Sequence, residues 1–123
     1  MKHSEELAMR QKIFEMQCEI CKALGHPVRL AIVDRLDERE IAAADLLEEL
    51  KISKANLSKH MTLLVHAGIV EHRREGRNIF YRLTDPEIHR ACTIMRSILY
   101  RRLKQGVKLA SAITPEGTHR GLP

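Results

Sequence analysis

The stretch from Ile52 to Gly68 (ISKANLSKHMTLLVHAG) limits the possible folds more than any other part of this chain. Ser53 is a favourable N-cap residue, and Gly68 stands where a helix commonly places its C′ glycine. Between them, apolar side chains recur at helical spacing: Leu57, Met61, Leu64 and Val65. This pattern predicts a helix that is held in a core along one side.

The other side of this predicted helix carries hydrogen-bond donors and no acidic residue. Its first two turns hold Lys54, Asn56, Ser58, Lys59 and His60. Such a surface suits the DNA major groove, where Lys and Asn side chains read base edges while Ser and Lys hold phosphates. Lys-rich polar faces are also common on ordinary solvated helices, so the pattern alone leaves both interpretations open. His60 is expected either to contact DNA or to pack beside the helix.

The excess of positive charge lies in the central third of the chain. The formal net charge is +5. Residues 51–83 contain seven Lys or Arg and two Asp or Glu, whereas the remainder contains 14 bases and 14 acids. This segregation favours a polyanionic partner, and nucleic acid is the commonest one for a small soluble protein.

Chain length and the two ends of the sequence predict one small cytoplasmic domain. In 123 residues we expect a DNA-binding domain over residues 1–106 and a disordered tail over residues 107–123, which is rich in small residues, Pro and Gly. The apolar runs are too short to span a membrane, and the charged N-terminus lacks the apolar stretch of a signal peptide. In a reducing compartment, the three cysteines are not expected to form a disulfide framework.

Three helical segments are predicted before residue 52. The first two are residues 5–24 and 27–36, separated by a Gly-His-Pro break, and the second is expected to keep Arg29 in solvent. The third, residues 41–50, leads through a tight turn at Lys51-Ile52 into the donor-rich helix. A short helix, a turn of about three residues and a donor-rich second helix together predict a helix-turn-helix.

After Gly68 the pattern changes from helical to alternating. Residues 69–74 and 78–83 are rich in β-branched and aromatic side chains, and Glu75-Gly76-Arg77 between them predicts a hairpin turn. Two strands alone are marginally stable, so we expect the hairpin to lie against the helices. Its basic end is predicted to touch phosphate or enter the minor groove through Arg73, Arg74, Arg77 and Asn78.

The first and last predicted helices have apolar arcs that are too wide for one small domain to cover. The last helix opens at Asp85-Pro86 and runs to about Gln105, with a stripe that includes Cys92, Met95 and Leu99. We expect these two helices to pair across a two-fold axis and form the dimerisation layer of a homodimer. The predicted fold class is therefore α+β and mainly helical, a winged helix-turn-helix.

Three ordered blocks of sequence resemble the ArsR–SmtB family of dimeric winged-helix repressors. Residues 21–33 (CKALGHPVRLAIV) are similar to the start of the family's second helix, residues 52–61 (ISKANLSKHM) to its recognition helix, and residues 73–83 (RREGRNIFYRL) to its wing. The resemblance covers roughly residues 22–103. It implies a repressor that releases double-stranded operator DNA when a metal, metalloid or reactive sulfur species binds. The recognition-helix contacts would be Ser53, Lys54, Asn56, Ser58, Lys59 and His60.

The better-known inducer sites of that family are not matched. Its arsenic and cadmium members carry Cys-x-Cys in the third helix, where this chain has Ala42 and Ala44. Its zinc and nickel members use Asp-x-His near the start of the last helix and a second pair later, but residues 100–103 contain no histidine or acid. Near the start of that helix this chain offers Asp85, Glu87 and His89. Its persulfide-sensing members pair two cysteines, of which Cys92 alone could match.

The three cysteines remain as the candidate sensor. Cys18 and Cys21 stand at i and i+3 of the first helix and so share a face, and Cys92 belongs to the last helix, which is expected beside the first. Three thiolates could bind As(III) or another soft metal ion, whereas zinc would want a fourth ligand such as His26 or water. The same thiols could instead be oxidised to a disulfide or polysulfide bridge, or could be buried as small apolar side chains.

We expect a repressor and not an enzyme. The enzymatic alternative is a thiol–disulfide oxidoreductase built on Cys18 and Cys21, but redox Cys-x-x-Cys pairs open a helix after a strand, whereas this pair is predicted mid-helix. A constitutive architectural DNA binder without an inducer is a third possibility. In the expected homodimer, two recognition helices enter successive major grooves about 34 Å apart.

Overall fold

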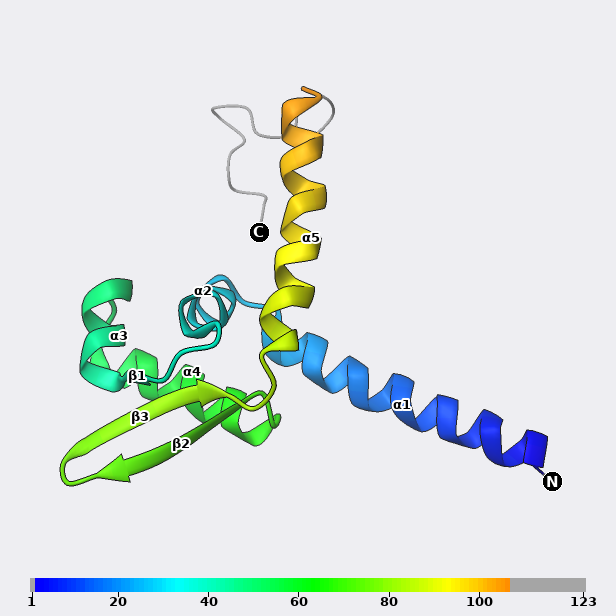
Figure 1. Cartoon of the computed structure of the whole chain (residues 1–123), viewed down its shortest axis with the longest axis horizontal. Helices are drawn as coiled ribbons and strands as arrows, with labels where there is room; N and C mark the ends of the chain where they lie inside the picture. The colour runs from blue at the N-terminus through cyan, green and yellow to red at the C-terminus, as the bar shows by residue number, and fades with distance from the viewer. Residues whose placement is uncertain (1, 107–123) are drawn as a thin grey trace. The chain divides into compact units, whose positions relative to one another are not determined.

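Eight helices and strands make up residues 2–106, the part of the chain that the computed structural model describes (Figure 1). In chain order they are α1 (Lys2–Leu24), α2 (Pro27–Leu36), β1 (Ile41–Ala42), α3 (Ala43–Leu50), α4 (Lys54–His66), β2 (Val70–Glu75), β3 (Asn78–Leu83) and α5 (Glu87–Lys104). They belong to two compact units, Met1–His89 and Arg90–Pro123, and α5 crosses from one to the other. The tail predicted to be disordered, residues 107–123, lies outside the described residues.

The core of the first unit is built from α2, α3, α4 and the sheet. Its buried apolar side chains are Ile32, Val33, Leu36, Ile41, Leu46, Leu57, Met61, Leu64, Ile69, Val70 and Leu83. Burial of a branched aliphatic or Met side chain contributes roughly 1.5–3 kcal/mol, so this cluster is the main force that holds α4 in place. The predicted inward face of α4 is confirmed at Leu57, Met61 and Leu64, while Val65 is half-buried.

The three strands form an antiparallel sheet in the order β1-β3-β2. The β2–β3 hairpin turns at Gly76-Arg77, and Gly76 takes the left-handed φ of +62° that two-residue hairpin turns require. The predicted hairpin is thus confirmed. The start of the third helix was predicted wrongly, because Ile41–Ala42 pair with β3 and α3 begins at Ala43. Ile41 is β-branched and buries its side chain as part of the short strand β1.

Both ends of α4 are fixed by hydrogen bonds. Ser53 Oγ accepts from the backbone N–H of Asn56 at 3.0 Å, which confirms the predicted N-cap. At the other end, the N–H of Gly68 donates to Val65 O and the N–H of Ile69 donates to Leu64 O, both at 3.0 Å. This is the Schellman arrangement, and Gly68 has the positive φ of +76° that it needs. Helix length and entry angle are therefore set locally.

The helices α1 and α5 keep large apolar side chains in solvent in the single chain. No residue of α1 is buried, and Leu7, Met9, Ile13, Phe14 and Met16 are exposed. The exposed apolar residues of α5 are Ile94, Met95, Ile98, Leu99, Tyr100 and Leu103. Among residues 2–106 there is no helix with the length and hydropathy needed to cross a membrane.

Candidate nucleic-acid interface

The helix-turn-helix consists of α3, a short turn and α4. Lys51 caps α3 with a left-handed φ of 55°, and its N–H donates to Leu47 O at 2.8 Å. The chain then reaches Ser53, the N-cap of α4, two residues later. Because Leu46 of α3 and Leu57 of α4 are both buried, the two helices are anchored in the same core. The arrangement presents the first turns of α4 to solvent.

The solvent side of α4 is a surface of hydrogen-bond donors. Lys54, Asn56, Ser58 and Lys59 are all exposed, and α4 contains no Asp or Glu. Ser53 is exposed as well, and although its oxygen accepts the capping bond, its hydroxyl can still donate. The structure therefore leaves these five predicted contact residues accessible around the first two turns of α4. Ammonium, amide and hydroxyl groups so placed can bind phosphate oxygens and base acceptors.

His60 differs from its neighbours, because its side chain is 4% exposed and faces the domain interior. Its Nδ1 lies 3.1 Å from Arg29 Nη1, and its ring centroid lies 4.5 Å from that of His26. A guanidinium can only donate, so His60 Nδ1 is the acceptor. Of the two alternatives expected for His60, this placement favours packing beside the helix over DNA contact.

The surroundings of His60 tie α4 to the start of α2. Arg29, whose predicted position in solvent is wrong, is half-buried, and its Nε donates to Ala23 O. His26 caps α2, since its Nδ1 accepts from the N–H of Val28 at 3.0 Å. Burial lowers the pKa of His60, and the nearby charges of His26, Arg29 and Lys59 lower it further. A neutral His60 is thus the form that fits this site.

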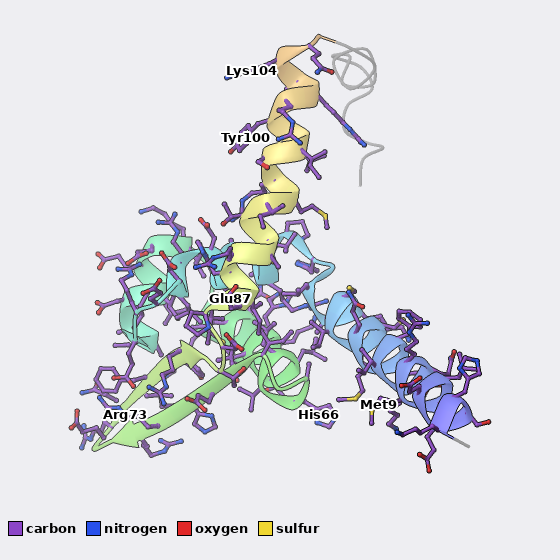
Figure 2. The ribbon with its side chains drawn as sticks, turned by 45° about the vertical axis from the view of Figure 1, so that its right-hand side comes forward. Met9, His66, Arg73, Glu87, Tyr100 and Lys104 are labelled. Carbon is purple, nitrogen blue, oxygen red and sulfur yellow. The ribbon has the colours of Figure 1, made fainter. Side chains whose placement is uncertain are left out.

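The β2–β3 hairpin, called the wing below, carries the four other predicted contact residues. Arg73, Arg74, Arg77 and Asn78 are all exposed near its turn, and Figure 2 shows Arg73 on this part of the molecule. Arg73 is held by an acidic partner, because its Nε and Nη2 donate to the carboxylate of Glu40 at 2.9 and 2.8 Å. Arg74 and Arg77 have no carboxylate within ion-pair distance among residues 2–106.

None of the three cysteines forms a disulfide. Cys18 and Cys21 are exposed on α1 in the first unit, and Cys92 is half-buried on α5 in the second. Cys18 and Cys21 share one side of α1, as their spacing predicted, whereas the expected third thiol belongs to the other unit. Within residues 2–106, no group of three or more His, Cys, Asp or Glu side chains is placed to hold a metal ion.

Two side chains that shape this surface were missed from the sequence. Glu40 directly precedes β1, and its pairing with Arg73 depends on this strand, which was not predicted. Arg29 was assigned to solvent, although an Arg three residues before the buried Ile32 stands on the same helix side as the core. That i, i+3 relation was the available signal.

Comparison with known proteins shows the family to which this chain belongs. A helix-turn-helix domain family matches residues 24–73. The biofilm growth-associated repressor of Xylella fastidiosa is 36% identical over 86 residues, which cover 70% of this chain and 75% of that protein. The solved structure of the repressor BigR from Xylella fastidiosa has a TM-score of 0.65 and 33% identity, covering 76% of this chain and 94% of that one. This chain belongs to the ArsR–SmtB family.

A further relative carries the family name itself. The SmtB repressor of Mycobacterium tuberculosis is 36% identical over 75 residues, which cover 61% of this chain and 56% of that protein. As an ArsR–SmtB member, the chain is a DNA-binding transcriptional regulator, and its matched relatives are regulators rather than enzymes. The resemblance predicted from three sequence blocks is confirmed, and so is the winged helix-turn-helix fold.

Proposed function

We propose that this chain is a homodimeric transcriptional repressor that binds double-stranded operator DNA through the exposed face of α4 and the tip of the wing. The observation that carries the proposal is the acid-free donor face of α4, held in place by buried Leu57, Met61 and Leu64 on the opposite face. The names of the Xylella fastidiosa and Mycobacterium tuberculosis relatives support repression as the regulatory outcome.

The recognition helix is tested with Lys59→Ala and Asn56→Ala. The DNA is a duplex that the wild-type protein selects from a random-sequence library, and binding is followed by fluorescence anisotropy. Both variants should bind more weakly while sedimenting like the wild type. Lys22→Ala is the matched control, because Lys22 is an exposed lysine on α1 that is paired with Glu19. Wild-type affinity in Lys59→Ala and Asn56→Ala would remove the assignment of α4.

The second copy is proposed to cover the apolar faces of α1 and α5. Phe14 and Met95, for example, are 60% and 65% exposed in the single chain. Monomeric proteins rarely leave so many large apolar side chains in water, and each buried one contributes roughly 1.5–3 kcal/mol. Sedimentation equilibrium should give a dimer, and a monomer at micromolar concentration would contradict this part of the proposal.

The inducer is proposed to act on the cysteines. Cys18 and Cys21 are exposed and about one helical turn apart, so both thiols can bind the same thiophilic reagent. A three-thiolate site for As(III) or a soft metal would need Cys92 beside them, from the same chain or from the second copy. The alternative is a redox or reactive-sulfur sensor in which the same thiols lose electrons to the inducer and form a sulfur bridge.

A cysteine scan separates these sensor chemistries. Cys18→Ser, Cys21→Ser and Cys92→Ser are titrated with arsenite, cadmium or tetrasulfide while bound to the selected duplex. If arsenite or cadmium releases the duplex and each substitution weakens this release, the cysteines form a thiolate metal site. Release of the duplex by tetrasulfide alone would indicate sulfur sensing. If Cys92→Ser responds like the wild type to every reagent, the three-thiol site is wrong. A coupling of about 1–3 kcal/mol would be enough to empty the operator.

Two other functions are tested by the same protein sample. A thiol–disulfide oxidoreductase would reduce insulin with dithiothreitol as electron source, but Cys18 and Cys21 lie in the interior of α1, away from its N-terminus. We expect no such activity. A constitutive architectural binder would keep its affinity for DNA in the presence of every thiol reagent, and we expect release instead.

A further inference from the structure

The wing has one face that carries only charged and polar side chains around a phenylalanine. Cross-strand partners lie side by side on the same face of a sheet, and residues two apart on a strand share that face. Phe80 of the central strand pairs with Ala42 of β1 on one side and with Arg73 of β2 on the other. We call this face, which holds Glu71, Arg73, Glu75, Asn78, Phe80 and Arg82, the outer face.

Arg73 crosses the outer face from one edge of the sheet to the other. Its guanidinium lies over the Phe80 ring, 4.5 Å from the centroid. Beyond the ring it meets Glu40, the residue before β1, through two parallel bonds of 2.9 and 2.8 Å. Its Nη1 also lies 3.7 Å from Glu75 Oε1. One side chain therefore links all three strands.

The contacts of Arg73 engage two of its five N–H groups with a single carboxylate. A fork of two N–H groups on one carboxylate is the geometry in which Arg is bound most specifically. The same pairing lowers the pKa of Glu40 and raises that of Arg73, because each charge stabilises the other. A phosphate bound by the same two N–H groups would have to displace Glu40.

The charge of the outer face also opposes a DNA contact there. Arg82 Nε donates to Glu71, so both outer-face arginines have acidic partners. Three carboxylates, those of Glu40, Glu71 and Glu75, thus face two guanidinium groups. By contrast, Arg77 stands in the turn and Arg74 points to the opposite face at the end of the hairpin.

We propose that Arg73 is a positioning residue that fixes the wing to Glu40, and that Arg77 and Arg74 at the tip make the phosphate contacts of the wing. This inference rests on the proposed DNA binding. It divides the three arginines of the basic end, which sequence alone treats alike, into one positioning residue and two contacting residues. Loss of the Arg73–Glu40 pair should free the tip from its fixed position on the domain.

Four variants test the proposal: Arg73→Lys, Arg73→Gln, Glu40→Gln and, as control, Arg77→Gln. Lys keeps the charge but cannot form the fork, so a phosphate contact would survive in Arg73→Lys whereas the positioning role would not. Affinity for the selected duplex is measured by anisotropy from 50 to 300 mM KCl. Each lost phosphate contact reduces the slope of log affinity against log salt by about 0.9.

We expect both Arg73 variants and Glu40→Gln to lose affinity by a similar factor, roughly three- to tenfold, with an unchanged salt slope. Arg77→Gln removes one contact from each subunit of the dimer and should reduce the slope by about 1.8. The proposal is overturned if Arg73→Lys binds like the wild type, if Glu40→Gln binds more tightly, or if Arg73→Gln reduces the slope as Arg77→Gln does. An unchanged slope in Arg77→Gln would remove the contact assigned to that residue.

A measurement without DNA separates this inference from the proposed function. Amide hydrogen exchange in β1 and β2 should be faster in Arg73→Lys and Glu40→Gln than in the wild type, and unchanged in Arg77→Gln. If the wild type selects no duplex, the proposed function fails, yet this measurement still decides whether Arg73 holds the wing. Wild-type protection in Arg73→Lys would overturn the positioning role.

Discussion

Substitutions at Ser53 should separate the stability of α4 from its contact with DNA. Ser53 Oγ accepts from the N–H of Asn56 at 3.0 Å, and the side chain is exposed. Removing such a cap in Ser53→Ala costs about 1 kcal/mol. In a domain of this size, 1 kcal/mol corresponds to a fall in Tm of roughly 4–8 °C. We therefore expect Ser53→Ala to melt several degrees below the wild type.

Ser53→Asp should keep the thermal stability of the wild type but bind DNA more weakly. The carboxylate keeps the capping acceptor and adds a negative charge at a helix N-terminus, which stabilises by about 0.3–1 kcal/mol. The same charge would stand beside Lys54 and Asn56 and face phosphate, and juxtaposed like charges cost several kcal/mol, equivalent to at least tenfold in affinity. Stability should thus be retained while DNA binding is lost.

The assay combines thermal melts followed by circular dichroism with anisotropy titrations of the selected duplex. Protein concentration is held fixed, because the Tm of a dimer depends on it. Ser4→Asp is the control, since it adds the same charge to the exposed start of α1. Wild-type DNA affinity in Ser53→Asp would refute the placement of the α4 N-terminus at DNA. An unchanged Tm in Ser53→Ala would refute the contribution of the cap.

Three further predictions concern stability. Leu64→Ala removes a side chain with 0% exposure and should lower the free energy of unfolding in urea by roughly 2–5 kcal/mol, whereas Leu63→Ala on the exposed side should change it little. The pKa of His60 is lower in the folded state than its unfolded value of 6.5, so stability should fall as pH drops below about 6.5, and this fall should be smaller in His60→Gln. This expectation would be contradicted if the urea midpoint of the wild type were greater at pH 5.5 than at pH 7.5 and His60→Gln removed that difference. Gly76→Ala places a Cβ at φ +62° and should cost about 1–2 kcal/mol, detected as faster amide exchange in β2 and β3.

The parts of the fold that the sequence predicts are those fixed by local chemistry. Ser53 and Gly68 bound α4 because a cap and a positive φ depend on the residue itself and its immediate neighbours. The wing is likewise predicted by the alternation of side chains along its two strands and by Gly76 in its turn. Helical periodicity then identifies the inward face of α4, where Leu57, Met61 and Leu64 are buried.

The features that were missed depend on contacts between distant segments. Ile41–Ala42 follow a helical pattern locally, and only pairing with Tyr81 and Phe80 makes them a strand. His60 belongs by sequence to a donor-rich turn, but the partner that turns it inward, Arg29, is 31 residues away. Side-chain type therefore indicated what these residues can bind, while tertiary structure decided which of them remain available.

The salt dependence of DNA binding should distinguish bases that are paired with carboxylates from bases that remain available for phosphate. Seven bases account for the positive charge of residues 51–83, but Arg73 and Arg82 are paired with carboxylates, one of them outside that segment. The five others have no carboxylate partner among the described residues: Lys51, Lys54, Lys59, Arg74 and Arg77.

If each of these five met a phosphate in both subunits of a dimer, the slope of log affinity against log salt would be about −9, whereas all seven would give about −13. We expect a measured slope no steeper than the first value. A slope near the second value that Arg73→Gln and Arg82→Gln both reduce would mean that the outer face of the wing contacts DNA. In that case Arg73 and Arg82 would exchange their carboxylate partners for phosphate on binding. The seven bases counted in the sequence would then predict the salt dependence better than the five bases that lack a carboxylate partner in the folded chain.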